Sequence, residues 1–348
     1  MYSLSVRVDE LMRLRGNDVL GYWLGDLPQG CKLCFSGLKS VLFVTGLCSV
    51  KCFYCPISPT RRLKDLIFIN DVEVRGVKDI LTEVAVSLSK GVGITGGEPL
   101  EVVDRVVELV KVLKNVFGDE FHTHLYTNGV KLDEVVMERL VNAGLDEIRI
   151  HVISDKSFNA LKKCLDYSVD VVVENPVIPN DVEGLKKIIE YAYGVGVKYV
   201  NLNELEVSEL NFDELVLRGF KISEDGRSVV GSKETALEVL RWVTDSGIGI
   251  SVHFCPAVYK DMHQYPMRLS KRAITTKRVF EVINNSIVKW LEVLDDETTN
   301  LYLQDLAIKL EDKYLTHVKL GRRFSKARVM EALPLTPRKV LNETPLSE

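Results

Sequence analysis

The pattern of apolar and polar positions alternates between two periods from residue 39 onward. Short runs rich in β-branched residues predict buried parallel strands, and longer stretches with a 3.6-residue period predict helices between them. The strands are expected at 40–46, 91–96, 121–127, 145–151, 169–175, 197–203 and 248–254. The helices are expected at 77–90, 102–117, 132–143, 156–166, 181–194 and 233–246. This alternation predicts right-handed β-α-β units and an α/β fold, an open, partial (βα)6-type parallel barrel.

Three segments fall outside this rhythm. Residues 1–38 form an N-terminal extension, the barrel occupies 39–255, and the C-terminal region 256–348 is expected to be mainly helical, with helices at 278–294 and 300–314. Within the barrel, residues 206–232 break the alternation, and Asp225-Gly226 predicts a hairpin turn. We interpret 206–232 as an insertion or a small flap.

Composition places the chain among ordinary globular proteins. Of its 348 residues, 46% are hydrophobic and 27% charged, and the formal net charge is −4. The chain has no apolar run of membrane-spanning length, and its N-terminus lacks the apolar core of a signal peptide. We therefore expect a cytoplasmic protein with no membrane partner. Seven cysteines in clusters favour metal binding over disulfides.

Three of these cysteines, Cys48, Cys52 and Cys55, follow the first predicted strand with C-x3-C-x2-C spacing. Cysteine thiolates hold iron–sulfur clusters, and three ligands on a four-iron cluster leave one iron open to another molecule. A structural zinc knuckle and scattered buried thiols are the alternatives. Zinc prefers four ligands in C-x2-C pairs, so this spacing favours the cluster.

Polar residues and glycines gather where the later strands end. The second strand ends in Gly96-Gly97-Glu98-Pro99, where the glycines allow close approach of the backbone to a ligand. The other strand ends carry Thr127, Asn128, Arg149, Glu174, Asn201, Asn203 and Glu204. Because buried polar groups are costly without partners, such a concentration at one end of a sheet indicates an active-site mouth.

The cysteine spacing, the Gly-Gly-Glu-Pro turn and the run Tyr126-Thr-Asn-Gly129 together resemble the radical S-adenosylmethionine (SAM) superfamily. The resemblance covers residues 39–255 and implies a [4Fe–4S] cluster on Cys48, Cys52 and Cys55 that chelates SAM and cleaves it to a 5′-deoxyadenosyl radical. It further implies that this radical abstracts hydrogen from a substrate, with an electron supplied by a reductant such as ferredoxin or flavodoxin. The residues expected to contact SAM are Tyr54, which with Phe53 would flank the adenine, and Gly96, Gly97, Glu98, Thr127, Asn128, Arg149, Glu174, Asn201 and Asn203.

Within the superfamily, the chain is most similar to archaeal proteins related to pyruvate formate-lyase activating enzyme. The pair Cys31-x2-Cys34 and the strand Asn201-Leu-Asn-Glu-Leu-Glu206 carry this similarity. About 90 residues follow the last predicted strand, whereas a minimal activase has none of them.

A second metal site is predicted from residues that the cluster does not use. Cys31 and Cys34 supply two ligands, Cys255 a third, and either His253 or His263 the fourth. Zinc accepts such a set, as does an auxiliary iron–sulfur cluster; two loops with free thiols are the alternative. Cys164 lies on a predicted helix and is interpreted as core packing.

The substrate is left open by the sequence, which assigns no catalytic side chain. Residues 268–348 hold fifteen basic against eleven acidic residues, including a cluster at Lys319, Arg322, Arg323, Lys326 and Arg328. A basic region suits a macromolecule, tRNA or a protein, whereas a mouth closed by the 206–232 flap suits a small metabolite. The competing class is a non-catalytic metal-binding protein that contacts nucleic acid.

Overall fold

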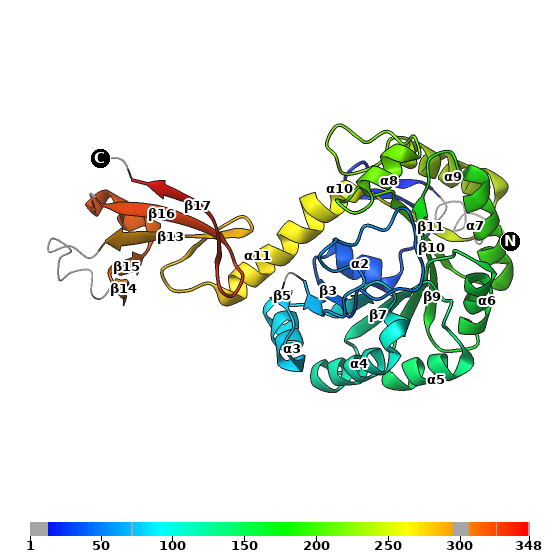
Figure 1. Ribbon diagram of the computed structural model, residues 1–348, viewed down its shortest axis with the longest axis horizontal. Helices are drawn as coiled ribbons and strands as arrows, with labels where there is room; N and C mark the ends of the chain where they lie inside the picture. The colour runs from blue at the N-terminus through cyan, green and yellow to red at the C-terminus, as the bar shows by residue number, and fades with distance from the viewer. Residues whose placement is uncertain (1–12, 71, 295–305, 325, 347–348) are drawn as a thin grey trace, which may run out of the picture. The chain divides into compact units, whose positions relative to one another are not determined.

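The structure, a computed structural model, describes residues 13–70, 72–294, 306–324 and 326–346 (Figure 1). The chain divides into two compact units, of which the first comprises 1–83 with 89–264 and the second 84–88 with 265–348.

The first unit is built on seven parallel strands that follow one another in the sheet in chain order. They are β3 (Lys39–Phe43), β6 (Gly91–Thr95), β7 (His122–Thr127), β8 (Glu147–Ile150), β9 (Asp170–Val177), β10 (Tyr199–Glu204) and β11 (Ser251–Cys255). Each matches a predicted strand, so the predicted α/β partial barrel is confirmed. Short runs of β-branched residues led to this prediction, such as Val171 to Val173 in β9, because strands covered on both faces favour Val and Ile.

Helices cover the outside of the curved sheet, as the labels in Figure 1 show. They are α3 (Val77–Val86), α4 (Val103–Phe117), α5 (Glu134–Ala143), α6 (Asp155–Cys164), α7 (Val182–Val195) and α9 (Ser232–Ser246). The 3₁₀ turn η1 (Pro99–Val102) precedes α4. All six helices were predicted. Cys164 is fully buried on α6 beside Met137, which confirms its packing role.

The N-terminal residues do not form a separate layer. β1 (Arg15–Asn17) and β2 (Gly21–Leu24) are antiparallel, and β2 pairs antiparallel with β11 at one edge of the sheet. The opposite edge is formed by β4 (Phe68–Ile69) and β5 (Val72–Glu73). The intervening helix α2 (Gln29–Phe35) lies within the ring of strands in Figure 1. Its Gly30 approaches His124 and Arg149 so closely that a Cβ there would lie 2.7 Å from the guanidinium.

The segment 206–232 contains the predicted hairpin. Ile222 pairs with Val229, and Gly226 adopts a φ of +72° at the turn. A short helix that was not predicted, α8 (Phe212–Leu217), precedes the hairpin. The segment is tied to the cysteine loop, because Asn211 Nδ2 donates to the carbonyl oxygen of Tyr54 at 3.0 Å.

The second unit corrects the expectation of a mainly helical C-terminal region. The short helix α10 (Ala257–Tyr259) and the π-helical turn Lys260–Gln264 still belong to the first unit. The long helix of the second unit is α11 (Tyr265–Thr276). A six-stranded antiparallel sheet follows, with the order β14-β15-β13-β16-β17 and β12 paired with β13. Its strands are β12 (Val282–Asn284), β13 (Ile287–Leu294), β14 (Ala307–Leu310), β15 (Lys313–Thr316), β16 (Ala327–Leu333) and β17 (Lys339–Pro345), with the 3₁₀ turn η4 (Val318–Arg323) between β15 and β16.

The predicted helix 278–294 is wrong for a specific physical reason. Both faces of β13 are apolar, with Val288 and Trp290 in one core cluster and Leu291 and Val293 in another. Apolar residues on both faces imitate the spacing of a helical stripe. Asn285, with a φ of +55°, makes the turn into β13 that a helix could not contain. Of the predicted helix 300–314, residues 300–305 lie outside the described residues, and 307–310 is strand.

None of the helices among the described residues is both long and apolar enough to span a lipid bilayer.

Candidate active site

A cavity of about 400 Å³ opens at the carboxyl ends of the parallel strands. Parallel α/β folds place their ligands at this end of the sheet, and ligand cavities generally fall between roughly 300 and 1,000 Å³. The predicted residues that line it are Cys48, Cys52, Tyr54, Cys55, Gly96, Gly97, Glu98, Thr127, Asn128, Arg149, Glu174 and Asn203. Asn201 is the predicted SAM contact that lies behind the wall, 3% exposed.

The cysteine loop leaves β3 and forms one wall of the cavity. All three thiols are unpaired and half-buried, and the backbone N–H of Val50 donates to Cys48 Sγ at 3.4 Å. Burial raises the pKa of Cys48 and Cys52, and the neighbouring thiols raise it further, so a bound cation would favour the thiolate form of these two residues. Their sulfurs are not all within 4.8 Å of one another, whereas two thiolates on one tetrahedral zinc ion lie roughly 3.8 Å apart. The wider spacing fits ligands of separate irons.

The two glycines after β6 allow the backbone to approach the cysteine loop closely, and both line the cavity. A Cβ on Gly96 would collide with the carbonyl oxygen of Thr45, and a Cβ on Gly97 with that of Leu47. This approach permits two backbone bonds, Gly97 N–H to Thr45 O at 2.8 Å and Glu98 N–H to Leu47 O at 2.7 Å. The glycine turn therefore holds the thiol-bearing loop in place.

Glu98 joins this turn to the end of β7. Its carboxylate accepts from the Leu100 N–H at 3.0 Å, the Thr127 hydroxyl at 2.7 Å and the Asn128 N–H at 2.8 Å. Burial raises the pKa of Glu98 in spite of these three donors, because the side chain is only 1% exposed. Its side chain is thus occupied by the protein, and it supports the cavity rather than reaching into it.

Arg149 and Glu174 form the charged floor of the cavity. Arg149 Nη1 donates to Glu174 Oε2 at 3.0 Å, and its Nε donates to Glu147 Oε1 at 2.5 Å. The amides of Asn201 and Asn203 both donate to Glu174 Oε1, at 2.6 and 2.7 Å. Asn201 therefore orients Glu174 from behind, which explains why it does not line the cavity.

Tyr54 lines the cavity, whereas Phe53, whose ring meets that of Tyr54 edge to face, is not among the lining residues. The Tyr54 hydroxyl lies 3.1 Å from His151 Nε2 inside the cavity. Phe53 instead stacks on Phe220, with ring centroids 6.1 Å apart, among apolar residues of the 206–232 segment. Tyr54 alone remains available to flank a purine.

The neutral state of His151 predicts acid sensitivity. Burial lowers the pKa of His151 to about 4, whereas an unfolded histidine titrates near 6.5. Between these values the unfolded chain binds the extra proton, so stability present above about pH 6.5 is lost as pH falls toward 4. We expect the His151 contribution to the free energy of unfolding to decrease by about 2 kcal/mol between pH 7.5 and 4.5.

Urea denaturation of the wild type and of His151→Asn at both pH values measures this. The variant should lose less stability on acidification than the wild type. Equal losses in the wild type and His151→Asn would contradict the prediction.

The structure brings the predicted second metal ligands into one neighbourhood without assembling a tetrahedral site. Burial raises the pKa of Cys255, and nearby Cys34 and Cys31 raise it further. Cys31 Sγ already accepts from Arg149 Nη2 at 3.4 Å, and His253 Nδ1 lies 2.5 Å from Asn201 Oδ1. His263 lies with its ring against Tyr259. Among the described residues, no group of metal-type ligand atoms within 4.8 Å of one another includes these side chains, so the second metal stays a prediction.

The polar interior beneath the cavity is the part that the sequence reasoning missed. His122, His124 and Glu147 are buried behind Arg149, and Lys260 lines the cavity in an ion pair with Glu206. A usable signal was present in His122-Thr-His124, because alternate residues of a buried strand share a face.

The fold and the cavity define a class of protein, an open (βα) barrel with three unpaired thiols beside a glycine turn at the mouth.

Residues 42–202 match the family model described as "Radical SAM superfamily". A protein of Methanocaldococcus jannaschii named "Putative glycyl-radical enzyme activating enzyme" is 39% identical over 300 residues, which are 82% of this chain and 78% of that protein. A GTP 3′,8-cyclase of Clostridium perfringens is 27% identical over 219 residues, 53% of this chain and 64% of the cyclase. SAM-bound SuiB of Streptococcus suis aligns with a TM-score of 0.45 and 14% identity over 63% of this chain and 50% of the SuiB chain.

The chain therefore belongs to the radical SAM superfamily and is a radical SAM enzyme, as the sequence predicted. Enzymes of this family use a [4Fe–4S] cluster and bind SAM.

Proposed function

We propose that Cys48, Cys52 and Cys55 hold the [4Fe–4S] cluster and that SAM binds in the cavity beside them. The observation that carries this proposal is that the three thiols, the glycine turn and the polar strand ends line one cavity. When bound, the reduced cluster would supply the electron that cleaves SAM to a 5′-deoxyadenosyl radical.

The chain's own residues would position SAM. The backbone of Gly96 to Pro99 borders the cavity next to Cys48, where it can meet the amino group of SAM. Glu174, whose side chain is 12% exposed, presents a carboxylate on the floor that suits the ribose hydroxyls, and the buried Arg149 holds that carboxylate in place. Tyr54 offers a flat apolar ring to the adenine, held by its contact with His151.

We propose further that the substrate is a protein and that the hydrogen is taken from a glycine Cα. The name of the Methanocaldococcus relative supports this, because an activating enzyme of that kind acts on another protein. In the balanced step, one electron from a reductant such as ferredoxin or flavodoxin cleaves SAM to methionine and the radical. The radical takes one hydrogen atom from glycine, leaving 5′-deoxyadenosine and a glycyl radical.

The charges of the second unit favour a protein over tRNA. Several of its basic side chains are matched by acidic ones across the sheet, as in Arg328–Glu343 at 3.0 Å, Lys313–Glu292 at 2.9 Å and the pair Lys289–Glu331. Paired cations leave less charge for phosphates.

The test measures the transfer of deuterium from the substrate to 5′-deoxyadenosine. Reconstituted enzyme, SAM and dithionite are incubated with total cellular protein labelled with deuterium at glycine Cα, or with bulk tRNA. Deuterium is expected in 5′-deoxyadenosine only with the labelled protein. Unlabelled 5′-deoxyadenosine with protein, together with tRNA-stimulated turnover that weakens steeply with salt, would instead favour tRNA.

A further inference from the structure

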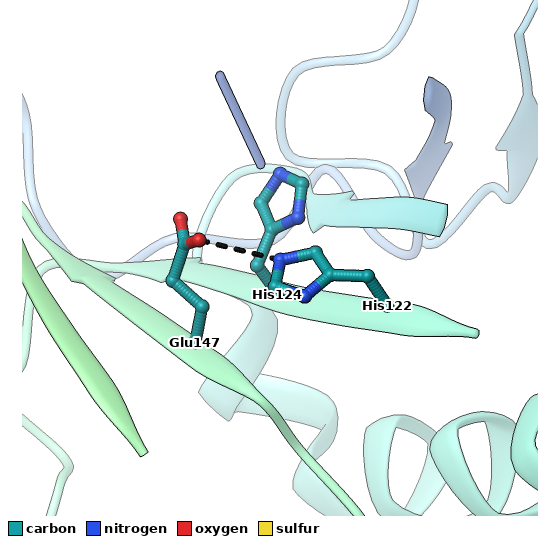
Figure 2. Close-up of side chains that lie close together, drawn as sticks. All are labelled: His122, His124 and Glu147. Carbon is teal, nitrogen blue, oxygen red and sulfur yellow. Dashed lines mark ion pairs between the residues drawn. The ribbon is translucent and has the colours of Figure 1, made fainter. Parts of the chain in front are cut away.

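Three buried side chains outside the cavity converge beneath α2. His122 and His124 lie two residues apart on β7, so both imidazoles leave the same face of the strand, and His124 pairs in register with Glu147 of β8. One ligand atom from each of the three side chains lies within 4.8 Å of the other two. Figure 2 shows how the three side chains lie together. Among the residues that the structure describes, this is the one group of three or more metal-type ligands so arranged.

His124 has no hydrogen-bond partner in the protein. Its side chain is completely buried, and neither Nδ1 nor Nε2 is satisfied. A buried polar group left unpaired costs about 1–3 kcal/mol, so an unpaired imidazole calls for an explanation. The ring sits in a cradle between two glycines: a Cβ on Gly93 would lie 2.6 Å from Nε2, and a Cβ on Gly30 would lie 3.0 Å from Nδ1.

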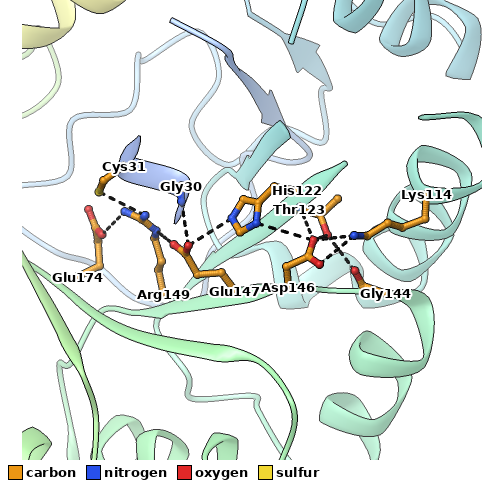
Figure 3. Close-up of polar contacts among 10 residues, drawn as sticks. All are labelled: Gly30, Cys31, Lys114, His122, Thr123, Gly144, Asp146, Glu147, Arg149 and Glu174. Carbon is orange, nitrogen blue, oxygen red and sulfur yellow. Dashed lines mark hydrogen bonds and ion pairs between the residues drawn. The ribbon is translucent and has the colours of Figure 1, made fainter. Parts of the chain in front are cut away.

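The other two side chains are spaced as ligands of one ion. His122 Nε2 lies 3.2 Å from Glu147 Oε2. Two ligands about 2.0–2.1 Å from a tetrahedral zinc ion would be roughly 3.4 Å apart. Behind His122, Nδ1 faces Asp146 Oδ2 at 4.0 Å, and Lys114 Nζ holds that carboxylate at 2.8 Å (Figure 3). Asp146 therefore lies on the Nδ1 side of His122, beyond hydrogen-bond distance of that nitrogen.

The contacts of Glu147 leave one of its oxygens able to bind a metal. Its Oε1 accepts from Arg149 Nε at 2.5 Å. Glu147 Oε2 accepts one bond, from the Gly30 N–H at 3.0 Å, which leaves it a second lone pair.

We propose that His122, His124 and Glu147 bind one divalent transition-metal ion of the zinc type, which ties β7 to β8 beneath α2. Two imidazoles and a carboxylate form a ligand set that zinc accepts. The nearby cations Arg149 and Lys39 repel a metal, so we expect weaker binding than at a thiolate zinc site. This site is separate from the cluster and does not depend on the proposed substrate.

The test uses the full chain with Cys48, Cys52 and Cys55 all replaced by Ala, so that no cluster iron contributes. Co²⁺ serves as the probe, because a tetrahedral Co²⁺ ion gives visible absorption bands and thiolate ligands add a sulfur-to-metal charge-transfer band. We expect one equivalent of Co²⁺ with visible bands and no charge-transfer band, displacement by Zn²⁺, and a melting temperature that rises with Zn²⁺ concentration.

His124→Gln in this background should weaken Co²⁺ binding at least about tenfold. This substitution is the informative one, because His124 makes no hydrogen bond whose loss would unfold the chain. The matched control, Cys31→Ser with Cys34→Ser, should bind as the parent does. The proposal would be overturned if the parent failed to bind one equivalent of Co²⁺, or if His124→Gln bound Co²⁺ as tightly as the parent. It would also be overturned by a charge-transfer band that the Cys31 and Cys34 substitutions remove.

Discussion

Replacing any one of Cys48, Cys52 or Cys55 with Ala is expected to reduce 5′-deoxyadenosine formation to background. Each thiol lines the same cavity and is unpaired, so none can take over the role of another. A cluster that loses one of three protein ligands exposes a second iron and is lost. The measurement is 5′-deoxyadenosine released from SAM by anaerobically reconstituted protein with dithionite, alongside its iron and sulfide content.

Cys164→Ala provides the matched control, because Cys164 is completely buried on α6 and far in sequence from the loop. It should lose some stability through packing but keep iron, sulfide and activity. A protein with all three loop cysteines replaced that still produced 5′-deoxyadenosine would refute the assignment of the cluster ligands. Colourless protein that contained only zinc would favour the non-catalytic class instead.

Arg149→Met is expected to lower the free energy of unfolding by about 3–5 kcal/mol. The Arg149 side chain is 1% exposed and bridges the completely buried Glu147 and the 12% exposed Glu174. Removing the guanidinium leaves Glu147 as a buried anion without its cation, and breaking a buried ion pair from one side costs far more than the net value of the pair. Urea denaturation at pH 7 measures the loss.

A double variant separates charge from packing. In Arg149→Met with Glu147→Gln the stranded anion is gone, so part of the lost stability should return. Arg149→Lys keeps the charge but not the fork that reaches both carboxylates, and it should fall between the wild type and Arg149→Met. A loss below about 1 kcal/mol in Arg149→Met would show that Glu147 is held by other groups.

The barrel could be predicted because its information is local. The parallel strands are short segments rich in β-branched and apolar residues, and each helix between them has an amphipathic period. The cavity residues followed from topology, since parallel strands end at the same edge and Thr127, Asn128, Arg149 and Glu174 all lie near the carboxyl ends of the predicted strands. That these residues lie close together could therefore be predicted from the order of the strands alone.

The features that could not be predicted depend on which faces of each strand are covered by other parts of the protein. A single sequence does not contain this information. β13 is apolar on both faces because two clusters flank it, and its pattern therefore looked helical. Asn201 and Asn203 share a face of β10 and both bond to Glu174, but Asn201 lies two residues further from the carboxyl end of the strand and so does not line the cavity. The close approach of Gly96 to Thr45 likewise joins two segments about fifty residues apart in the sequence.

Because β2 pairs with β11, this edge of the sheet can form only after nearly three quarters of the chain has been synthesised. Leu24 lies opposite Val252, and the Asp26 N–H bonds to the Ser251 hydroxyl across 225 positions of sequence. At about 5–20 residues per second, the N-terminal strand emerges roughly ten seconds to a minute before its partner exists. During that interval its edge is open to other chains, and contacts of such long sequence separation also slow folding. Nascent chains stalled before residue 251 should therefore be more sensitive to protease within residues 13–24 than the released protein.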